Sequence, residues 1–238
     1  MISIVIPAFN EQARILSSLR SLGRFCDTHF EHYEIVCVDD GSTDHTWDLI
    51  TGAKEIPALR PLRLNQNKGK GHAVGRGMLN AAGEFRFFTD ADLPYHPQAF
   101  ELAMDAFDSH ACDIVCGDRN LSESRAGVRV YSARRVAGRI FAAVVKIVMG
   151  VDASDTQCGF KGFTASAAEK IFSRLNTCGY AFDVEIFVLA RQLRLDVCRV
   201  PVTLIQQAGS KIRLIRDPFW MLVDLLRLVF AKGRRKRE

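Results

Sequence analysis

The chain has 238 residues, of which 48% are hydrophobic and 25% charged, and its formal net charge is +5. The composition is typical of a globular protein, and the length suffices for one sizeable α/β domain with room for a terminal appendage. The seven cysteines are odd in number and lack C-x-x-C or zinc-site spacing, so we expect thiols in a reducing compartment. Met1 leads almost directly into a predicted strand, which leaves no room for a cleavable leader, and we expect no secretion.

The first half of the chain alternates between strand and helix patterns. Apolar runs predict strands over residues 3–7, 34–38, 61–64, 85–89 and 113–117, and amphipathic patterns predict helices over 11–24, 45–54, 72–82 and 97–108. Thr43 or Asp44 is placed to cap the helix that begins at 45. This order predicts a mostly parallel sheet with right-handed crossovers and flanking helices.

The second half contains two apolar helical patterns beside basic residues. An arginine-rich stretch without acidic residues begins just before residues 130–149 and continues into them. The second pattern, over residues 219–232, is followed by a basic tail. The first is too short and too charged to span a bilayer, and apolar helices beside cationic clusters are typical of membrane surfaces. For 130–149, packing on the domain core is an equally good interpretation.

Polar residues gather where the predicted strands end. Asp39 and Asp40 follow the second strand, and Asp90 and Asp92 follow the fourth. Residues two apart on an extended backbone share a side, so the second pair can face one divalent cation such as Mg²⁺ or Mn²⁺. The alternative is an acidic turn that caps the helix near Pro97.

Residues 67–71 (NKGKG) follow the third strand and lead into a predicted helix. Their backbone N–H groups and two lysines could cradle a phosphate, although the segment lacks Walker spacing. Strand ends on one edge of a sheet converge, so the three segments predict a site for a nucleoside diphosphate held through a metal.

Short segments along nearly the whole chain resemble, in order, the motifs of a known enzyme family. The motifs of inverting family 2 glycosyltransferases with the GT-A fold resemble four segments of this chain: 7–11 (PAFNE), 38–44 (VDDGSTD), 67–71 (NKGKG) and 90–92 (DAD). Three later segments resemble the dolichyl-phosphate β-glucosyltransferase branch of this family: 155–161 (DTQCGFK), 182–185 (FDVE) and 209–211 (GSK). They resemble the dolichyl-phosphate mannose synthases more loosely.

The resemblance implies an α/β GT-A domain over residues 1–216, with a nucleotide-sugar half (1–120) and an acceptor half (121–216). Residues 217–238 would form an amphipathic, membrane-associating helix and a basic tail. The implied reaction is transfer of a hexose, with glucose from UDP-glucose favoured, to a polyprenyl or dolichyl phosphate. Ile205 stands where mannose synthases carry an arginine, which weakens a GDP-mannose assignment. Pro94 stands where some of them place a glutamine near the metal, so that ligand would be water, another residue or absent.

The resemblance and the positions of the motifs together assign roles to individual residues. The residues expected to bind the nucleotide sugar are Pro7, Phe9, Glu11, Cys37, Asp39, Lys68, Lys70, Asp90, Ala91 and Asp92, with Asp92 and Asp90 holding a Mg²⁺ or Mn²⁺ ion. The residues expected to bind the acceptor are Arg119, Arg134, Arg135, Asp155 and Gln157. The residues expected to act in catalysis are Asp90, Asp92, Arg119 and Lys211.

The implied chemistry requires charge neutralisation more than a base, because a phosphate oxygen is already anionic at neutral pH. Direct displacement would invert the anomeric carbon while the metal and lysines neutralise the departing diphosphate. Asp183 and Glu185 are two apart on a predicted helix and do not face each other, so we favour structural or positioning roles for both.

The expected location is peripheral, on the cytoplasmic face of an anionic membrane. A membrane protein or a second copy of the chain is the alternative partner for the C-terminal helix. Nucleic acid is not expected, because the aromatic residues of 219–230 lie in an aliphatic stripe. The remaining enzymatic alternatives are transfer to a hydroxyl of a glycan or metabolite and a GDP-mannose donor.

Overall fold

The computed structural model describes residues 1–110, 112–121, 124, 155, 158–177, 179 and 182–205. Its strands form one sheet in the order β3-β2-β1-β4-β6-β5-β7. The strands are β1 (Ile2–Ala8), β2 (Tyr33–Asp39), β3 (Leu59–Arg63), β4 (Phe85–Phe88), β5 (Ile114–Asp118), β6 (Lys161–Thr164) and β7 (Val197–Pro201). The helices are α1 (Ile15–His29), α2 (Thr46–Gly52), α3 (Lys70–Asn80), α4 (Gln98–His110), α6 (Ala165–Phe172) and α7 (Phe182–Gln192).

The predicted mostly parallel sheet is confirmed, with one reversed strand. Strand β6 pairs antiparallel with β4 and with β5, whereas the other neighbouring strands are parallel. Helix α1 begins four residues later than predicted, because Glu11 opens a turn in which its carbonyl accepts the N–H groups of Arg14 and Ile15. The reversal places the segment that precedes β6 beside the residues that follow β4.

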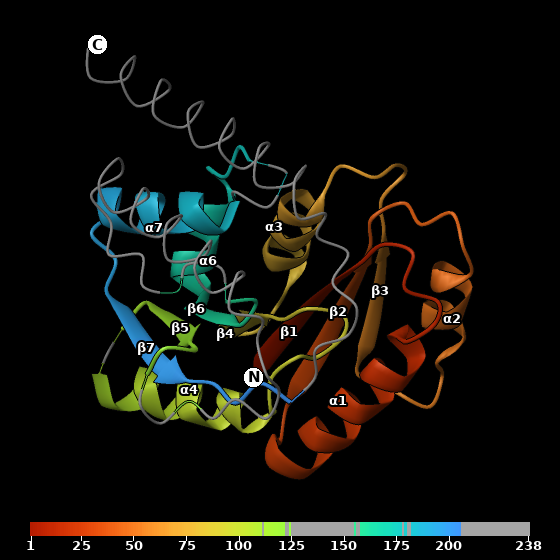
Figure 1. Cartoon of the computed structure of the whole chain (residues 1–238), viewed down its shortest axis with the longest axis horizontal. Helices are drawn as coiled ribbons and strands as arrows, with labels where there is room; N and C mark the ends of the chain where they lie inside the picture. The colour runs from red at the N-terminus through yellow and green to blue at the C-terminus, as the bar shows by residue number, and fades with distance from the viewer. Residues whose placement is uncertain are drawn as a thin grey trace.

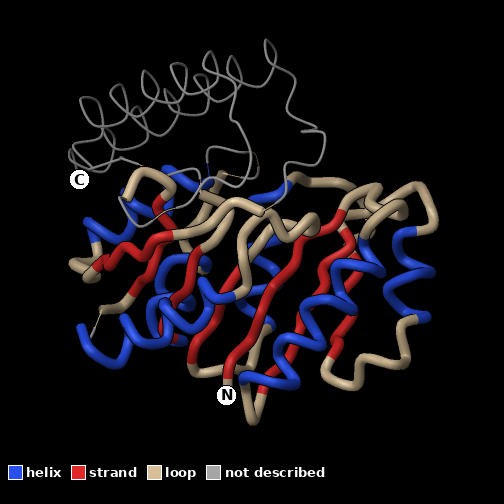
Figure 2. The backbone as a smooth tube through the Cα atoms, turned by 60° about the horizontal axis from the view of Figure 1, so that its bottom comes forward, coloured by secondary structure: helices blue, strands red, loops and turns tan. Residues whose placement is uncertain are grey.

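The sheet is the middle layer of three (Figures 1 and 2). Alternate residues of β1 point to opposite faces, since Ile4 and Ile6 pack with α1, α2 and α4 while Val5 packs with α3, α6 and α7. Phenylalanines 87 and 88 continue this alternation on β4. Burial on both faces explains why the central parallel strands β1 and β2 are largely apolar.

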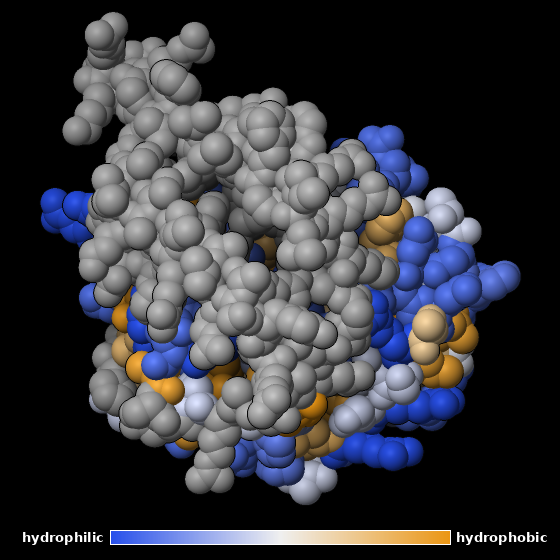
Figure 3. Space-filling model, in the orientation of Figure 1, coloured by the Kyte–Doolittle hydropathy of each residue, from blue (hydrophilic) through white to orange (hydrophobic). Residues whose placement is uncertain are grey.

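Figure 2 shows loops along the edge of the sheet opposite the N-terminus, where β1, β2 and β4 end. These strands are neighbours and parallel, so the segments that follow them lie along one edge. Figure 3 shows a largely hydrophilic surface with scattered hydrophobic residues over the region of α1, α2 and β3. The fold thus gathers the polar strand ends in the way that the sequence predicts.

Several predictions lie outside the described residues: the helices over 130–149 and 219–232, and the whole of segment 206–238. Among the helices that the structure does describe, none combines the length and apolar character needed to cross a membrane. Six of the seven cysteines are described, and all six are free thiols. Burial raises the pKa of Cys26 to about 12, and the charge of Asp27 adds to this, so its thiol is unreactive at neutral pH.

Glu34 ties three segments together at the amino edge of the sheet. Its carboxylate accepts hydrogen bonds from Ser3 Oγ and from the Ala82 N–H, each at 2.6 Å, and pairs with Arg60. Although burial raises the pKa of Glu34, these bonds lower it by more, and the net shift is downward from 4.5. The ionised form is therefore favoured by folding, and its contribution is lost as the pH falls through the lowered pKa.

Replacing Glu34 with glutamine is expected to lower the free energy of unfolding at pH 7 by about 1–3 kcal/mol, because bonds to a charged acceptor are lost. The difference from the wild type should shrink as the pH falls below the usual glutamate range. Urea unfolding at several pH values measures this difference. Glu31→Gln is the control, since that side chain is 90% exposed and should have little effect at any pH. A pH-independent loss for Glu34→Gln would contradict the assignment.

Candidate active site

Asp39 ends β2 with a fully buried carboxylate. Its Oδ1 accepts the Ser42 N–H at 3.1 Å, whereas its Oδ2 has no hydrogen-bond partner within the described part of the chain. The guanidinium of Arg63 lies 3.4 Å from Oδ2 and 5.2 Å from the ring centre of Trp47. A buried acceptor without a hydrogen bond is costly unless a ligand supplies the donor.

The carboxylate of Asp40 occupies part of the predicted phosphate cradle, which corrects that prediction. Its two carboxylate oxygens accept the N–H groups of Lys68 at 3.0 Å and Gly69 at 2.8 Å, so these donors already have a partner within the protein. Burial raises the pKa of Asp40 despite these bonds. Gly41 has a φ of +69°, and a Cβ there would lie 2.6 Å from the backbone of Gln66. The close packing requires glycine at this position.

Asp90 and Asp92 occupy a turn rather than an extended strand. The Leu93 N–H donates to the Asp90 carbonyl at 3.0 Å, and Leu93 itself has a φ of 44°. The predicted extended alternation is therefore wrong, because β4 ends at Phe88. The two carboxylates still interact, since burial and then the charge of Asp90 raise the pKa of Asp92.

Each carboxylate of this turn has a cationic neighbour among the described residues. Lys70 Nζ lies 2.5 Å from Asp90 Oδ1, and Arg14 Nη1 lies 3.7 Å from Asp92 Oδ2. Burial and the charge of Asp90 outweigh the effect of Arg14, so the pKa of Asp92 stays raised. Two oxygen ligands of this kind suit Mg²⁺ or Mn²⁺ when water and phosphate complete the coordination. The described residues contain no cluster of three or more metal-ligating side chains, so the remaining ligands would have to come from elsewhere.

Arg119 and Asp155 are brought together although they lie 36 positions apart. Arg119 Nε and Nη2 donate to the two carboxylate oxygens of Asp155 at 2.8 and 2.6 Å, and the Arg119 N–H adds a third bond at 2.8 Å. The Asp155 side chain is 5% exposed and that of Arg119 is 45% exposed. The bidentate pair fixes the guanidinium plane while leaving part of it open at the end of β5.

The remaining residues assigned to the nucleotide differ in accessibility. Phe9 is exposed and Pro7 partly exposed, whereas Glu11 pairs with Arg14 at 2.5 Å between Oε2 and Nε. Cys37 is fully buried in the hydrophobic core, and its assignment to the nucleotide pocket stays a prediction. Its position on β2, two residues before Asp39, places it beneath that carboxylate on the same face of the sheet.

Ala91 is buried within the acidic turn. Pro94 and Ile205, which the sequence comparison singles out separately, are joined by a hydrogen bond of 2.9 Å from the Ile205 N–H to the Pro94 carbonyl. Ile205 is 47% exposed, so both positions lie at one surface near this turn. Four predicted site residues lie outside the described residues: Arg134, Arg135, Gln157 and Lys211.

Sequence reasoning gave no role to a buried ion pair beneath the acidic turn. Lys161 Nζ lies 2.6 Å from Asp183 Oδ1 and donates to the Cys158 carbonyl at 2.7 Å. The only sequence signal is a lysine between phenylalanines in an otherwise apolar strand. Glu185, in contrast, accepts the N–H groups of Asn176 and Thr177. These contacts agree with the structural or positioning roles expected for Asp183 and Glu185.

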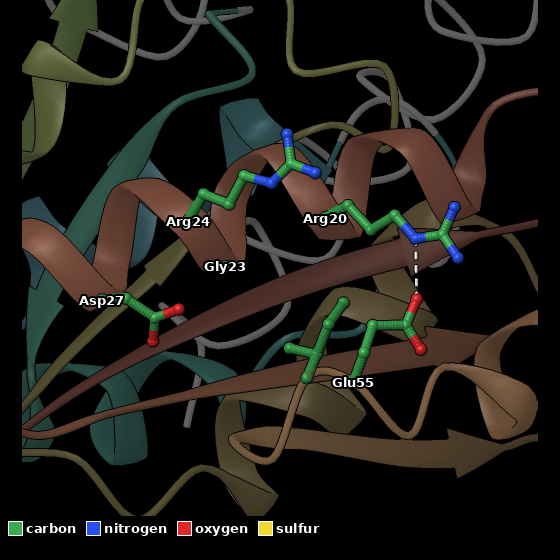
Figure 4. A pocket seen from close by; sticks show the side chains of 6 residues that line it. Arg20, Gly23, Arg24, Asp27 and Glu55 are labelled. Carbon is green, nitrogen blue, oxygen red and sulfur yellow. Dashed lines mark hydrogen bonds and ion pairs between the residues drawn. The ribbon is translucent and has the colours of Figure 1, made fainter.

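A cavity of about 270 Å³ lies away from this site (Figure 4). It is lined by Arg20, Gly23, Arg24 and Asp27 of α1 and by Glu55 and Ile56, which precede β3. Figure 4 shows the ion pair between Arg20 and Glu55 at its rim. Since Glu55 and Ile56 precede a parallel strand, the cavity lies towards the amino edge of the sheet, and the acidic strand ends lie at the opposite edge.

The fold and the acidic strand ends together define an α/β enzyme of the nucleotide-binding type. The chain belongs to glycosyl transferase family 2, since the family model "Glycosyl transferase family 2" matches residues 3–172. It is therefore a glycosyltransferase. The resemblance seen in the sequence motifs is confirmed.

A curated relative, dolichyl-phosphate beta-glucosyltransferase of Dictyostelium discoideum, is 35% identical over 96% of this chain and 74% of its own length. Among solved structures, mannosyl-3-phosphoglycerate synthase from Rubrobacter xylanophilus has a TM-score of 0.75 at 16% identity, over 98% of this chain and 75% of that chain. Glucosyl-3-phosphoglycerate synthase from Mycobacterium tuberculosis, solved with Mn²⁺, UDP and glucosyl-3-phosphoglycerate, has a TM-score of 0.66 at 21% identity, over 97% and 77%. These structural similarities establish the GT-A fold.

Proposed function

We propose that this glycosyltransferase transfers glucose from UDP-glucose to a dolichyl or other polyprenyl phosphate, with inversion and with a divalent cation. The observation that carries the proposal is the turn containing Asp90 and Asp92, which places two carboxylates and the ammonium of Lys70 together just beyond the carboxyl end of β4. The relative named dolichyl-phosphate beta-glucosyltransferase supports the choice of donor sugar and acceptor.

In this proposal the residues at different strand ends bind different parts of the donor. Asp39 offers its buried Oδ2 to an N–H or O–H group of the nucleoside, because this oxygen accepts no bond from the described protein. Asp90 and Asp92 hold Mg²⁺ or Mn²⁺, which when bound neutralises charge on the diphosphate. Lys70 lies close enough to Asp90 to add positive charge beside the same group.

Arg119 is the described residue best suited to the acceptor phosphate. Asp155 holds the Nε–Nη2 edge of its guanidinium, and the exposed remainder can contact a phosphate oxygen without losing the pair. Arg134, Arg135, Gln157 and Lys211 keep the acceptor and diphosphate roles assigned from the sequence. An anionic acceptor needs no strong base, so orientation and charge neutralisation provide the catalysis.

The proposed location is the cytoplasmic face of a membrane, with residues 217–238 as the membrane-associating segment. The basic tail supports this, since clustered lysines and arginines are attracted to anionic lipids. We propose residues 1–120 as the nucleotide-sugar half of the domain and 121–216 as the acceptor half. A membrane protein or second copy as partner for the C-terminal segment is the competing proposal.

The test measures transfer of radiolabelled hexose to dolichyl or undecaprenyl phosphate in detergent, with UDP-glucose and GDP-mannose compared in parallel. Metal-dependent labelling of the lipid from UDP-glucose is the expected result, with β stereochemistry in the product. Labelling from GDP-mannose alone would show that the donor is GDP-mannose and not UDP-glucose. If UDP-glucose binds with metal but labels only hydroxyl acceptors, the polyprenyl phosphate assignment is wrong.

A further inference from the structure

The Asp90 carboxylate lies directly against Gly159. Strand β6 pairs antiparallel with β4, and Phe88 is opposite Lys161. The same register, continued by two residues, sets Asp90 opposite Gly159. A Cβ on Gly159 would lie 2.1 Å from Oδ2 and 2.9 Å from Cγ of Asp90. Only a residue without a side chain leaves the carboxylate in its present position.

The peptide bond between Cys158 and Gly159 is held at both of its polar groups. Its N–H donates to the hydroxyl oxygen of Tyr95 at 3.4 Å, and Tyr95 is buried. The carbonyl of Cys158, on the preceding residue, accepts a bond of 2.7 Å from Lys161 Nζ. The backbone on which Asp90 rests is therefore anchored by two buried side chains.

The lysine anchor is itself fixed by a buried ion pair. Lys161 is fully buried, and its ammonium lies 2.6 Å from Asp183 Oδ1 and 5.3 Å from the ring centre of Phe88. The ammonium thus joins α7, the turn before β6 and the last residue of β4. A buried ion pair is often no more stabilising than apolar residues of equal size, so geometric control is a better reason for its presence.

We propose that Gly159, held by the pair of Lys161 and Asp183, is the positioning residue that sets the Asp90 carboxylate for the cation and diphosphate. The inference rests on the proposed function for what Asp90 binds, but the position of Asp90 can be tested without it. Gly159 acts through Asp90 and need not touch the donor. In this arrangement the segment that leads into the reversed strand β6 supports a residue that follows β4.

The test compares Gly159→Ala with the wild type by crystal structure and by calorimetric titration of UDP in the presence of Mn²⁺. The new methyl group should displace the Asp90 carboxylate by about 1 Å, because such contacts need more than 3.0 Å. We expect the affinity for UDP with Mn²⁺ to fall by about tenfold or more, in line with other residues that orient metal ligands. Gly75→Ala is the matched control, since its Cβ would meet only ordinary contacts at 3.9 Å.

A double-mutant cycle tests whether the effect passes through Asp90. In an Asp90→Ala background, Gly159→Ala should cause no further loss of affinity. An equal loss in both backgrounds, or a crystal structure with Asp90 unmoved, would overturn the inference. If Asp90 moves but the wild type does not bind UDP with Mn²⁺, the proposed function fails while the positioning of Asp90 by Gly159 is supported.

Discussion

Replacing Lys161 with methionine is expected to lower the free energy of unfolding by about 3–5 kcal/mol. The change leaves the Asp183 carboxylate, 7% exposed, without its cation, and a buried unpaired charge is far more costly than the lost contact alone. The Cys158 carbonyl also loses its bond from Nζ. Urea unfolding followed by circular dichroism measures the loss. A change below about 1 kcal/mol would mean that water or another residue pairs with Asp183.

The control is the double variant Lys161→Met with Asp183→Leu. Because both charges are removed together, most of the stability should return, as for other buried pairs replaced by apolar side chains. The two anchors of the turn before β6 are then reduced to one, so affinity for UDP with Mn²⁺ should remain below that of the wild type. Recovery of stability without recovery of binding distinguishes a positioning role from a purely structural one.

Much of the fold could be predicted because its signals are local. Strands β1 to β5 and the helices between them each have an apolar pattern of the correct period, and their order implies a parallel sheet. The reversed strand β6 has no such signal. Lys161 and Gly162 interrupt its apolar run and Gly159 precedes it, and these residues are explained only by their contacts with β4, the turn after β4 and α7.

The candidate site shows the same division between local and non-local information. The acidic strand ends were predictable, since each follows an apolar run. The partners of those residues were not predictable, because Lys70 reaches Asp90 from α3 and Arg119 reaches Asp155 across 36 positions. Asp40 shows the limit of motif reasoning, since its carboxylate takes the N–H groups that the glycine-rich segment was expected to offer a phosphate.

Replacing Asp92 with asparagine is expected to reduce the transfer rate at least about 100-fold. A metal ion contributes several kcal/mol to stabilising a departing diphosphate, and about 1.4 kcal/mol corresponds to a tenfold change in rate. The amide keeps the size of the carboxylate but removes its charge. Transfer from UDP-glucose at saturating Mn²⁺ measures the loss, and Asp48→Asn, with a side chain 73% exposed on α2, is the control.

The same substitution should leave the metal-free protein at least as stable as the wild type. Burial and the neighbouring Asp90 raise the pKa of Asp92 in the folded state, so folding favours its protonated form. The stability that this proton contributes is lost as the pH rises through the raised pKa, and at pH 7 the ionised carboxylate opposes folding. The amide of the Asp92→Asn variant carries no such charge, so a melting temperature equal to or above that of the wild type is expected without metal. A clearly lower melting temperature would show that Asp92 serves the fold, whereas lost activity with retained stability shows that its charge is kept for the reaction.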